Sequence, residues 1–255
     1  EKRGMSSFTF SNLLGSVYNG GSTCFTPDGN SLLSPVGNRI TVFNLTKNSS
    51  KTLPFQNLEN VEHIALSPDG SLLISVDVSG RAILANFHRR AVLSHFNFKS
   101  RVRALAFSPN GKWIAATKGR NVQIWKSPGS HKEFAPFVLK RTLTGHHEDV
   151  TSVSWSADSM HVITGSEDLT ARVFSMYRWK SSASIRPPPP ALLSGHRDSL
   201  IGAYFMKDDH TIVTVAKDGG VYGWVFREEK KIQLNNNNPD DSSSDNNSDD
   251  SSSDN

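Results

Sequence analysis

The chain has 255 residues, of which 36% are hydrophobic and 20% are charged, and its formal net charge is +4. This composition supports a folded core, but no stretch approaches the roughly 18 consecutive apolar residues of a transmembrane helix, so a membrane span is not expected. The single cysteine, Cys24, cannot form an internal disulfide, which is typical of a protein from a reducing compartment.

The first seven residues carry no apolar pattern and are predicted to be disordered, and residues 8–234 are predicted to form the folded part. Five segments within it begin with an apolar residue followed by a polar turn, usually Pro-Asp-Gly or Pro-Asn-Gly. The leading residues are Phe25, Leu66, Phe107, Trp155 and Phe205, which are 41, 41, 48 and 50 residues apart. This period matches the roughly 40–45 residues of a WD-type repeat, with insertions in the last two intervals.

Two further apolar runs follow each turn. In the third segment they are Trp113-Ile114-Ala115 and Val122-Gln123-Ile124-Trp125. Alternation with a period of two predicts strands, and small antiparallel sheets of this kind are stable only when neighbouring sheets cover their faces. The fold class is therefore an all-β, WD40-type β-propeller with about five blades of an incomplete first propeller, followed by a disordered acidic tail. The predicted blades lie near residues 22–45, 61–87, 102–126, 150–175 and 200–226.

The blade signature is degenerate, because the Trp-Asp dipeptide does not occur and Gly-His occurs twice. In the fifth blade, His196 is predicted to bond Asp218 and, through Thr214, to reach the indole N–H of Trp224. This blade is expected to keep the usual hydrogen-bond chain best.

The fourth blade has His146, Thr164 and Asp168 in the same order, but its chain should stop at Phe174, which has no N–H group. A catalytic triad would need a nucleophile beside a base. A trio that recurs at blade spacing is instead predicted to satisfy buried polar groups, so both sets are interpreted as a structural hydrogen-bond network. We therefore expect no enzyme activity.

No cofactor or metal site is expected. The adjacent His146-His147-Glu148 lacks a third ligand at suitable spacing, and the paired glycines belong to turns rather than to a phosphate-binding loop. Nothing in the sequence indicates a small-molecule substrate.

Two insertions separate the later blades. Phe134-Ala135-Pro136-Phe137 could contact a partner or pack onto the blade edge, and the sequence leaves both alternatives open. In the second insertion, Arg178, Trp179 and Lys180 combine stacking and charge as single-stranded RNA contacts do, so they are candidates for a partner or RNA contact.

Residues 235–255 consist of Asn, Ser and Asp apart from Pro239, and are predicted to be a disordered linker. They contain six aspartates and no basic residue, so residues 1–234 carry 28 basic against 18 acidic side chains. This basic excess suits a nucleic-acid-rich setting, or reflects basic residues spread over a solvated surface. Ser242 and Ser251 each have Asp three residues later, which predicts possible phosphorylation by an acidophilic kinase.

Several short segments outside the general WD-repeat pattern resemble sequences of the periodic tryptophan protein 2 family, whose members are WD-repeat proteins of ribosome assembly. They include Leu32-Leu33-Ser34-Pro35-Val36-Gly37-Asn38-Arg39, His95-Phe96-Asn97-Phe98-Lys99 and Gln123-Ile124-Trp125-Lys126. The resemblance spans residues 8 to about 226, and family members also carry an acidic stretch after the fifth blade.

The resemblance implies a non-enzymatic scaffold of the small-subunit processome, located in the nucleolus of the nucleus, which supports small-subunit rRNA processing. It implies other WD-repeat and helical proteins of a processome subcomplex as partners, together with small nucleolar RNA and precursor ribosomal RNA, and no membrane. The repeats alone leave an alternative open, namely a WD-repeat adaptor of another class, such as a ubiquitin-ligase substrate receptor or a trafficking coat subunit.

Overall fold

The computed structural model describes residues 20–129, 133, 135–176, 189–207 and 210–225, and every regular element among them is a β-strand. These residues contain no helix that is long and apolar enough to cross a membrane. The predictions for residues 1–7 and 235–255 lie outside the described residues. The all-β class is confirmed.

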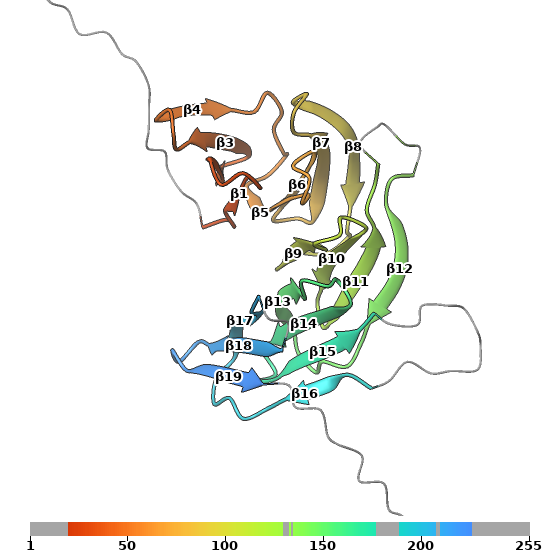
Figure 1. The fold of residues 1–255 in the computed structure, drawn as a ribbon. Helices are drawn as coiled ribbons and strands as arrows, with labels where there is room; N and C mark the ends of the chain where they lie inside the picture. Colours follow the sequence, from red (N-terminus) through yellow and green to blue (C-terminus); the bar gives the residue numbers. More distant parts are fainter. Residues whose placement is uncertain (1–19, 130–132, 134, 177–188, 208–209, 226–255) are drawn as a thin grey trace, which may run out of the picture. The chain divides into compact units, whose positions relative to one another are not determined.

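The strands form five antiparallel sheets in chain order (Figure 1). The first two sheets comprise β1 (Cys24–Phe25), β2 (Ser31–Val36), β3 (Arg39–Asn44) and β4 (Ser49–Thr52), then β5 (Val61–Leu66), β6 (Leu72–Asp77), β7 (Arg81–Asn86) and β8 (Ala91–Asn97). The third comprises β9 (Leu105–Phe107), β10 (Trp113–Lys118), β11 (Asn121–Lys126) and β12 (Val138–Leu143). The last two comprise β13 (Val150–Trp155), β14 (His161–Ser166), β15 (Ala171–Ser175) and β16 (Ala191–Leu193), then β17 (Leu200–Phe205), β18 (Thr211–Ala216) and β19 (Val221–Val225).

Each of the five leading apolar residues ends the first strand of its sheet, and in the first four sheets the turn after it has a common construction. In the second sheet, the Ser67 hydroxyl bonds the Asp69 carboxylate and accepts the Leu72 amide at 2.9 Å. Gly70 adopts a φ of 72°, which glycine tolerates best. The Ser-Pro-Asp-Gly motif therefore closes the turn by side-chain bonds as well as by backbone shape.

The fourth sheet departs from this rule, because Ser159 stands where the turns of the first three sheets have glycine and adopts a φ of 61°. Its hydroxyl accepts the Asn110 amide of the preceding turn at 3.0 Å. A contact between two neighbouring sheets thus accompanies the less favourable backbone conformation.

The hydrophobic core lies between successive sheets rather than within any one of them. The period of two sends alternate side chains of each second strand to opposite neighbours. In β6, Leu73 packs toward the first sheet, whereas Leu72 and Ile74 pack toward the third. In β14, Val162 packs toward the third sheet and Ile163 toward the fifth. Because each sheet depends on its neighbours for burial, the sheets are blades of a propeller.

The fourth strand of a blade was not predicted from the sequence. The strands β4, β8, β12 and β16 extend the first four sheets beyond the predicted blade limits of residues 45, 87, 126 and 175. Their side chains are mostly exposed or half-buried, so they lack the apolar alternation that marks the inner strands. The fifth sheet has three strands among the described residues.

Candidate functional site

The hydrogen-bond network of the fourth blade joins the chain before β13 to the β14–β15 turn. His146 Nδ1 lies 2.9 Å from Asp168 Oδ2, and His146 Nε2 lies 2.7 Å from Thr164 Oγ1. The Thr164 hydroxyl also contacts the Arg172 carbonyl at 3.3 Å. Phe174 is buried nearby and has no group to add, so the network ends at the threonine.

Asp168 is the centre of this network. It also accepts hydrogen bonds from the His147 amide at 2.9 Å, the Thr170 amide at 3.1 Å and the Thr170 hydroxyl at 2.6 Å. Burial raises the pKa of Asp168, but the hydrogen bonds from Thr170, His147 and His146 outweigh burial and bring the pKa to about 2. Burial lowers the pKa of His146 more than Asp168 raises it, so the imidazole is neutral at pH 7.

The fifth blade makes two of the three predicted contacts. His196 Nε2 lies 2.9 Å from Thr214 Oγ1, and the indole N–H of Trp224 donates to the same hydroxyl at 2.8 Å. The predicted bond to Asp218 does not form: His196 Nδ1 is buried without a partner among the described residues, and Asp218 accepts the Gly220 amide at 2.9 Å. The expectation that this blade keeps the chain best was therefore wrong at its carboxylate end.

The second blade has a polar pair that the sequence analysis missed. Asn57 lies four residues before Val61 of β5, just as His146 lies four residues before Val150 of β13. The Ser75 hydroxyl donates to Asn57 Oδ1 at 2.9 Å in place of the histidine–threonine contact. The common spacing to the first strand could have identified Asn57, but an asparagine in a loop is not by itself a recognisable signal.

Aromatic packing replaces the polar chain in the third blade. Phe98 occupies the position four residues before Val102, and Trp125 lies edge-on to both Phe96 and Phe98, at centroid distances of 5.1 and 6.0 Å. Phe137 stacks on Phe96 at 4.4 Å. Of the two alternatives left open for this insertion, the contacts of Phe137 correspond to packing onto the blade edge. Phe134 lies outside the described residues.

None of these networks has the geometry of a catalytic site. Thr164 and Thr214 are both fully buried, so neither hydroxyl can reach a substrate. The described residues also contain no group of three or more His, Cys, Asp or Glu side chains that could hold a metal ion. Cys24 is half-buried, and burial raises the pKa of its thiol, which disfavours the reactive thiolate. The arrangement supports binding and structural roles.

Ion pairs join successive blades on the side of the β14–β15 turn. Arg103 contacts both Asp149, at 3.2 Å, and Glu167. Arg101 Nε donates to Glu62 Oε2 at 3.0 Å. These arginines are thus partly neutralised by acidic neighbours, and the partly exposed pairs contribute only about 0–1 kcal/mol each to stability.

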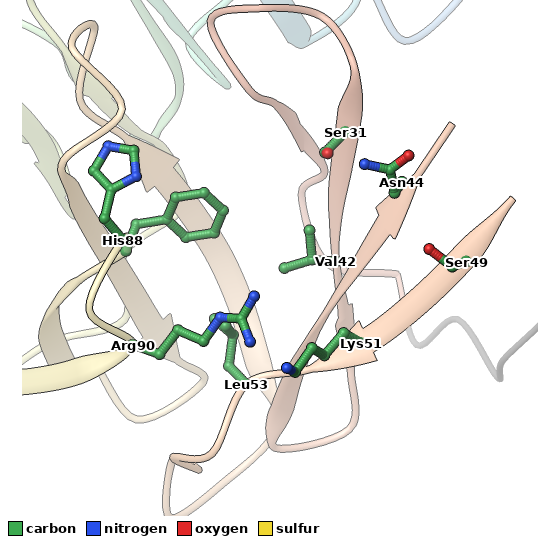
Figure 2. Close-up of a pocket in the computed structure, with 9 residues that line it drawn as sticks. Ser31, Val42, Asn44, Ser49, Lys51, Leu53, His88 and Arg90 are labelled. Atoms are coloured by element: carbon green, nitrogen blue, oxygen red, sulfur yellow. The ribbon is translucent and has the colours of Figure 1, made fainter. Parts of the chain in front are cut away.

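A basic pocket lies between the first and second blades. Its volume is about 340 Å³, and it is bounded by β3 and β4 on one side and by the β7–β8 turn on the other. Figure 2 shows Lys51 and Arg90 extending toward one another across the opening, with Leu53 at its base. The nine lining residues are Ser31, Val42, Asn44, Ser49, Lys51, Leu53, Phe87, His88 and Arg90. None is acidic, so the pocket is a candidate binding site for an anionic group.

This pocket was not predicted from the sequence, because its residues come from three separate segments and form no motif. The only available signal was the Arg89-Arg90 dipeptide. The residues that were selected for partner or RNA contact, Arg178, Trp179 and Lys180, lie outside the described residues. So do the predicted phosphorylation sites Ser242 and Ser251.

Comparison with known sequences defines the class of protein. The profile of the WD domain, G-beta repeat, matches residues 89–126, which contain β8 to β11, and residues 137–175, which contain β12 to β15. Together with the five sheets, this match shows that the chain belongs to the WD-repeat proteins and confirms the predicted fold class.

Similarity to individual WD-repeat proteins shows which family within this class the chain belongs to. The chain is 51% identical to the periodic tryptophan protein 2 homologue of Schizosaccharomyces pombe over 221 residues, 47% identical to periodic tryptophan protein 2 of Saccharomyces cerevisiae over 223, and 41% identical to the Mus musculus homologue over 217. These matches cover 86%, 87% and 85% of the chain, which spans about a quarter of each relative's length (25%, 24% and 23%). The chain belongs to the periodic tryptophan protein 2 family.

Proposed function

We propose that this chain is part of a non-enzymatic WD-repeat scaffold in ribosome biogenesis, which helps to assemble the small-subunit processome on precursor ribosomal RNA. The observation that carries the proposal is the family relationship, at 51% identity over 86% of the chain. In this role the blades hold partner proteins and RNA in place and carry out no reaction.

The physical character of the chain supports such a role. The blades offer extended surfaces and turns, and the buried polar groups serve internal bonding rather than catalysis. The basic excess of residues 1–234 favours association with polyanionic RNA, because each neutralised phosphate releases counterions. The partners in this proposal are other WD-repeat and helical proteins, small nucleolar RNA and precursor ribosomal RNA, and the location is the nucleolus.

Affinity purification of the full-length protein from cells, followed by RNA sequencing and mass spectrometry, tests the proposal. We expect enrichment of precursor ribosomal RNA and of a small nucleolar RNA over a tag-only control. Depletion of the protein should lead to accumulation of unprocessed small-subunit precursor. Recovery of cullin or trafficking-coat subunits without those RNAs would refute the proposal and favour an adaptor of another class.

A further inference from the structure

The pocket between the first two blades has an unbalanced charge. It contains Lys51, Arg90 and His88 and no acidic residue. By contrast, Arg101 and Arg103, which bridge blades elsewhere on the described surface, are paired with carboxylates. Among the described residues, neither Lys51 nor Arg90 makes an ion pair, so both ammonium and guanidinium groups are free for an anionic ligand.

The position of Arg90 is also unusual. It adopts a φ of 55°, a left-handed conformation that glycine or asparagine would occupy at lower cost. The corresponding turn of the first blade uses Asn48 in this conformation, at a φ of 47°. Arginine in this conformation therefore costs local free energy, and it places a cation at the mouth of the pocket (Figure 2).

The pocket adjoins an open sheet edge. In the first blade, β4 pairs with β3, and none of the described strands pairs with its other side. Ser49 and Lys51 are two residues apart on β4 and both line the pocket. An extended segment that pairs with β4 would send its own alternate side chains toward the same pocket.

The residues that line the pocket are better suited to bind an acidic side chain of a partner protein than a nucleotide. Val42, Leu53 and Phe87 belong to the apolar cluster between the two blades, so they can cover the methylene groups of a glutamate while the cations bind its carboxylate. Phe87 is half-buried against that cluster, so part of its ring is already engaged in packing and less of it is left for a base to stack upon.

We propose that this pocket and the β4 edge bind an extended acidic segment of a partner protein, with a carboxylate held between Lys51 and Arg90. The inference rests on the proposed scaffold function and names the chemistry of one partner contact. It concerns direct binding, which is measured with purified components. Its failure is therefore distinguishable from a failure to recover ribosomal RNA precursors from cells.

The first experiment measures binding of a fluorescein-labelled eight-residue peptide of alternating threonine and glutamate to the full-length protein. A peptide with glutamine in place of glutamate is the uncharged control. The double variant Lys51→Gln, Arg90→Gln should bind the acidic peptide about tenfold more weakly or worse, because it loses two charge-assisted contacts. The matched variant Lys47→Gln, Arg89→Gln removes the same charge from the adjacent β3–β4 and β7–β8 turns but not from the pocket lining, and should retain most of the affinity.

A second measurement tests whether the peptide pairs with the open edge of β4. Hydrogen exchange of the amides of residues 49–52 should slow when the acidic peptide binds, and the pocket variants should have the same melting temperature as the parent protein. Equal peptide affinity in the two double variants would overturn the proposal. So would unchanged exchange in β4, or a single-stranded oligouridine probe that binds more tightly than the peptide and loses affinity only in the pocket variant.

Discussion

Replacing Asp168 with alanine should destabilise the fold far more than the same replacement of Asp218, although the two aspartates were predicted to have the same role. Asp168 accepts four hydrogen bonds, at 2.6 to 3.1 Å, and its side chain is 7% exposed. Asp218 accepts only one bond from a described residue, the Gly220 amide at 2.9 Å, in an exposed turn.

The expected loss of unfolding free energy depends on which hydrogen-bonding groups lose their partner in each variant. Without Asp168, the N–H of His146 is stranded in a side chain that is 2% exposed, at a cost of about 1–3 kcal/mol. The lost contacts to Thr170 and His147 bring the expected total to about 3 kcal/mol. Loss of the single contact of Asp218 should cost about 0.5–1 kcal/mol, since the freed amide can bond to water.

Urea unfolding followed by tryptophan fluorescence would measure both values, provided that the slope with denaturant is unchanged between variants. The comparison is controlled internally, because both substitutions remove a carboxylate from the same type of turn. Equal losses of stability in the two variants, or a loss below about 1 kcal/mol for Asp168→Ala, would refute the assignment of the network.

Three further outcomes are expected. Gly80→Ala should prevent stable folding, because the added Cβ would lie 2.0 Å from a backbone oxygen, whereas Gly219→Ala, at nearly the same φ but with open space around it, should cost only about 1 kcal/mol in thermal melts. Phe137→Ala should lower the unfolding free energy by about 2–4 kcal/mol, as measured in urea, because it removes a ring from the aromatic cluster. Stability should also fall as the pH drops from about 7 to 5: burial holds the folded-state pKa of His146 and His196 below the unfolded value of about 6.5, so the unfolded chain takes up protons first. A calorimetric melting temperature that stays constant or rises over that range would contradict this reasoning.

The sequence predicted the inner strands of each blade because their constraints are local. The leading residues Phe25, Leu66 and Phe107 are each followed by a turn whose hydroxyl and glycine define the chain reversal. Burial between two neighbouring blades then keeps both faces of the second and third strands largely apolar. The outer strands lack this enforcement, since one side of each is open, and β4 consists of Ser, Ser, Lys and Thr. Periodicity could not identify a strand of that composition.

The polar networks were predictable in position but not in detail. His146 and His196 occupy equivalent places, yet only the first engages its carboxylate. The two turns differ two residues after the aspartate: Thr170 bonds Asp168 through its amide and its hydroxyl, whereas Gly220 bonds Asp218 through its amide alone. The order of histidine, threonine and aspartate does not reveal this difference.

The third blade explains why a degenerate signature is compatible with this fold. Trp125 has an indole N–H without a hydrogen-bond partner among the described residues, which would be costly if nothing offset it. Its ring instead packs against Phe96, Phe98 and Phe137, all within 6.4 Å between centroids. Aromatic burial of this extent is worth more than one hydrogen bond. The blade fold is therefore maintained by the apolar packing between neighbouring blades. The polar hydrogen-bond network is one of several arrangements that can occupy the adjoining space, and aromatic packing is another. This freedom leaves the exposed edges and turns, including the basic pocket, as the parts of the surface that can differ between WD-repeat proteins and select their partners.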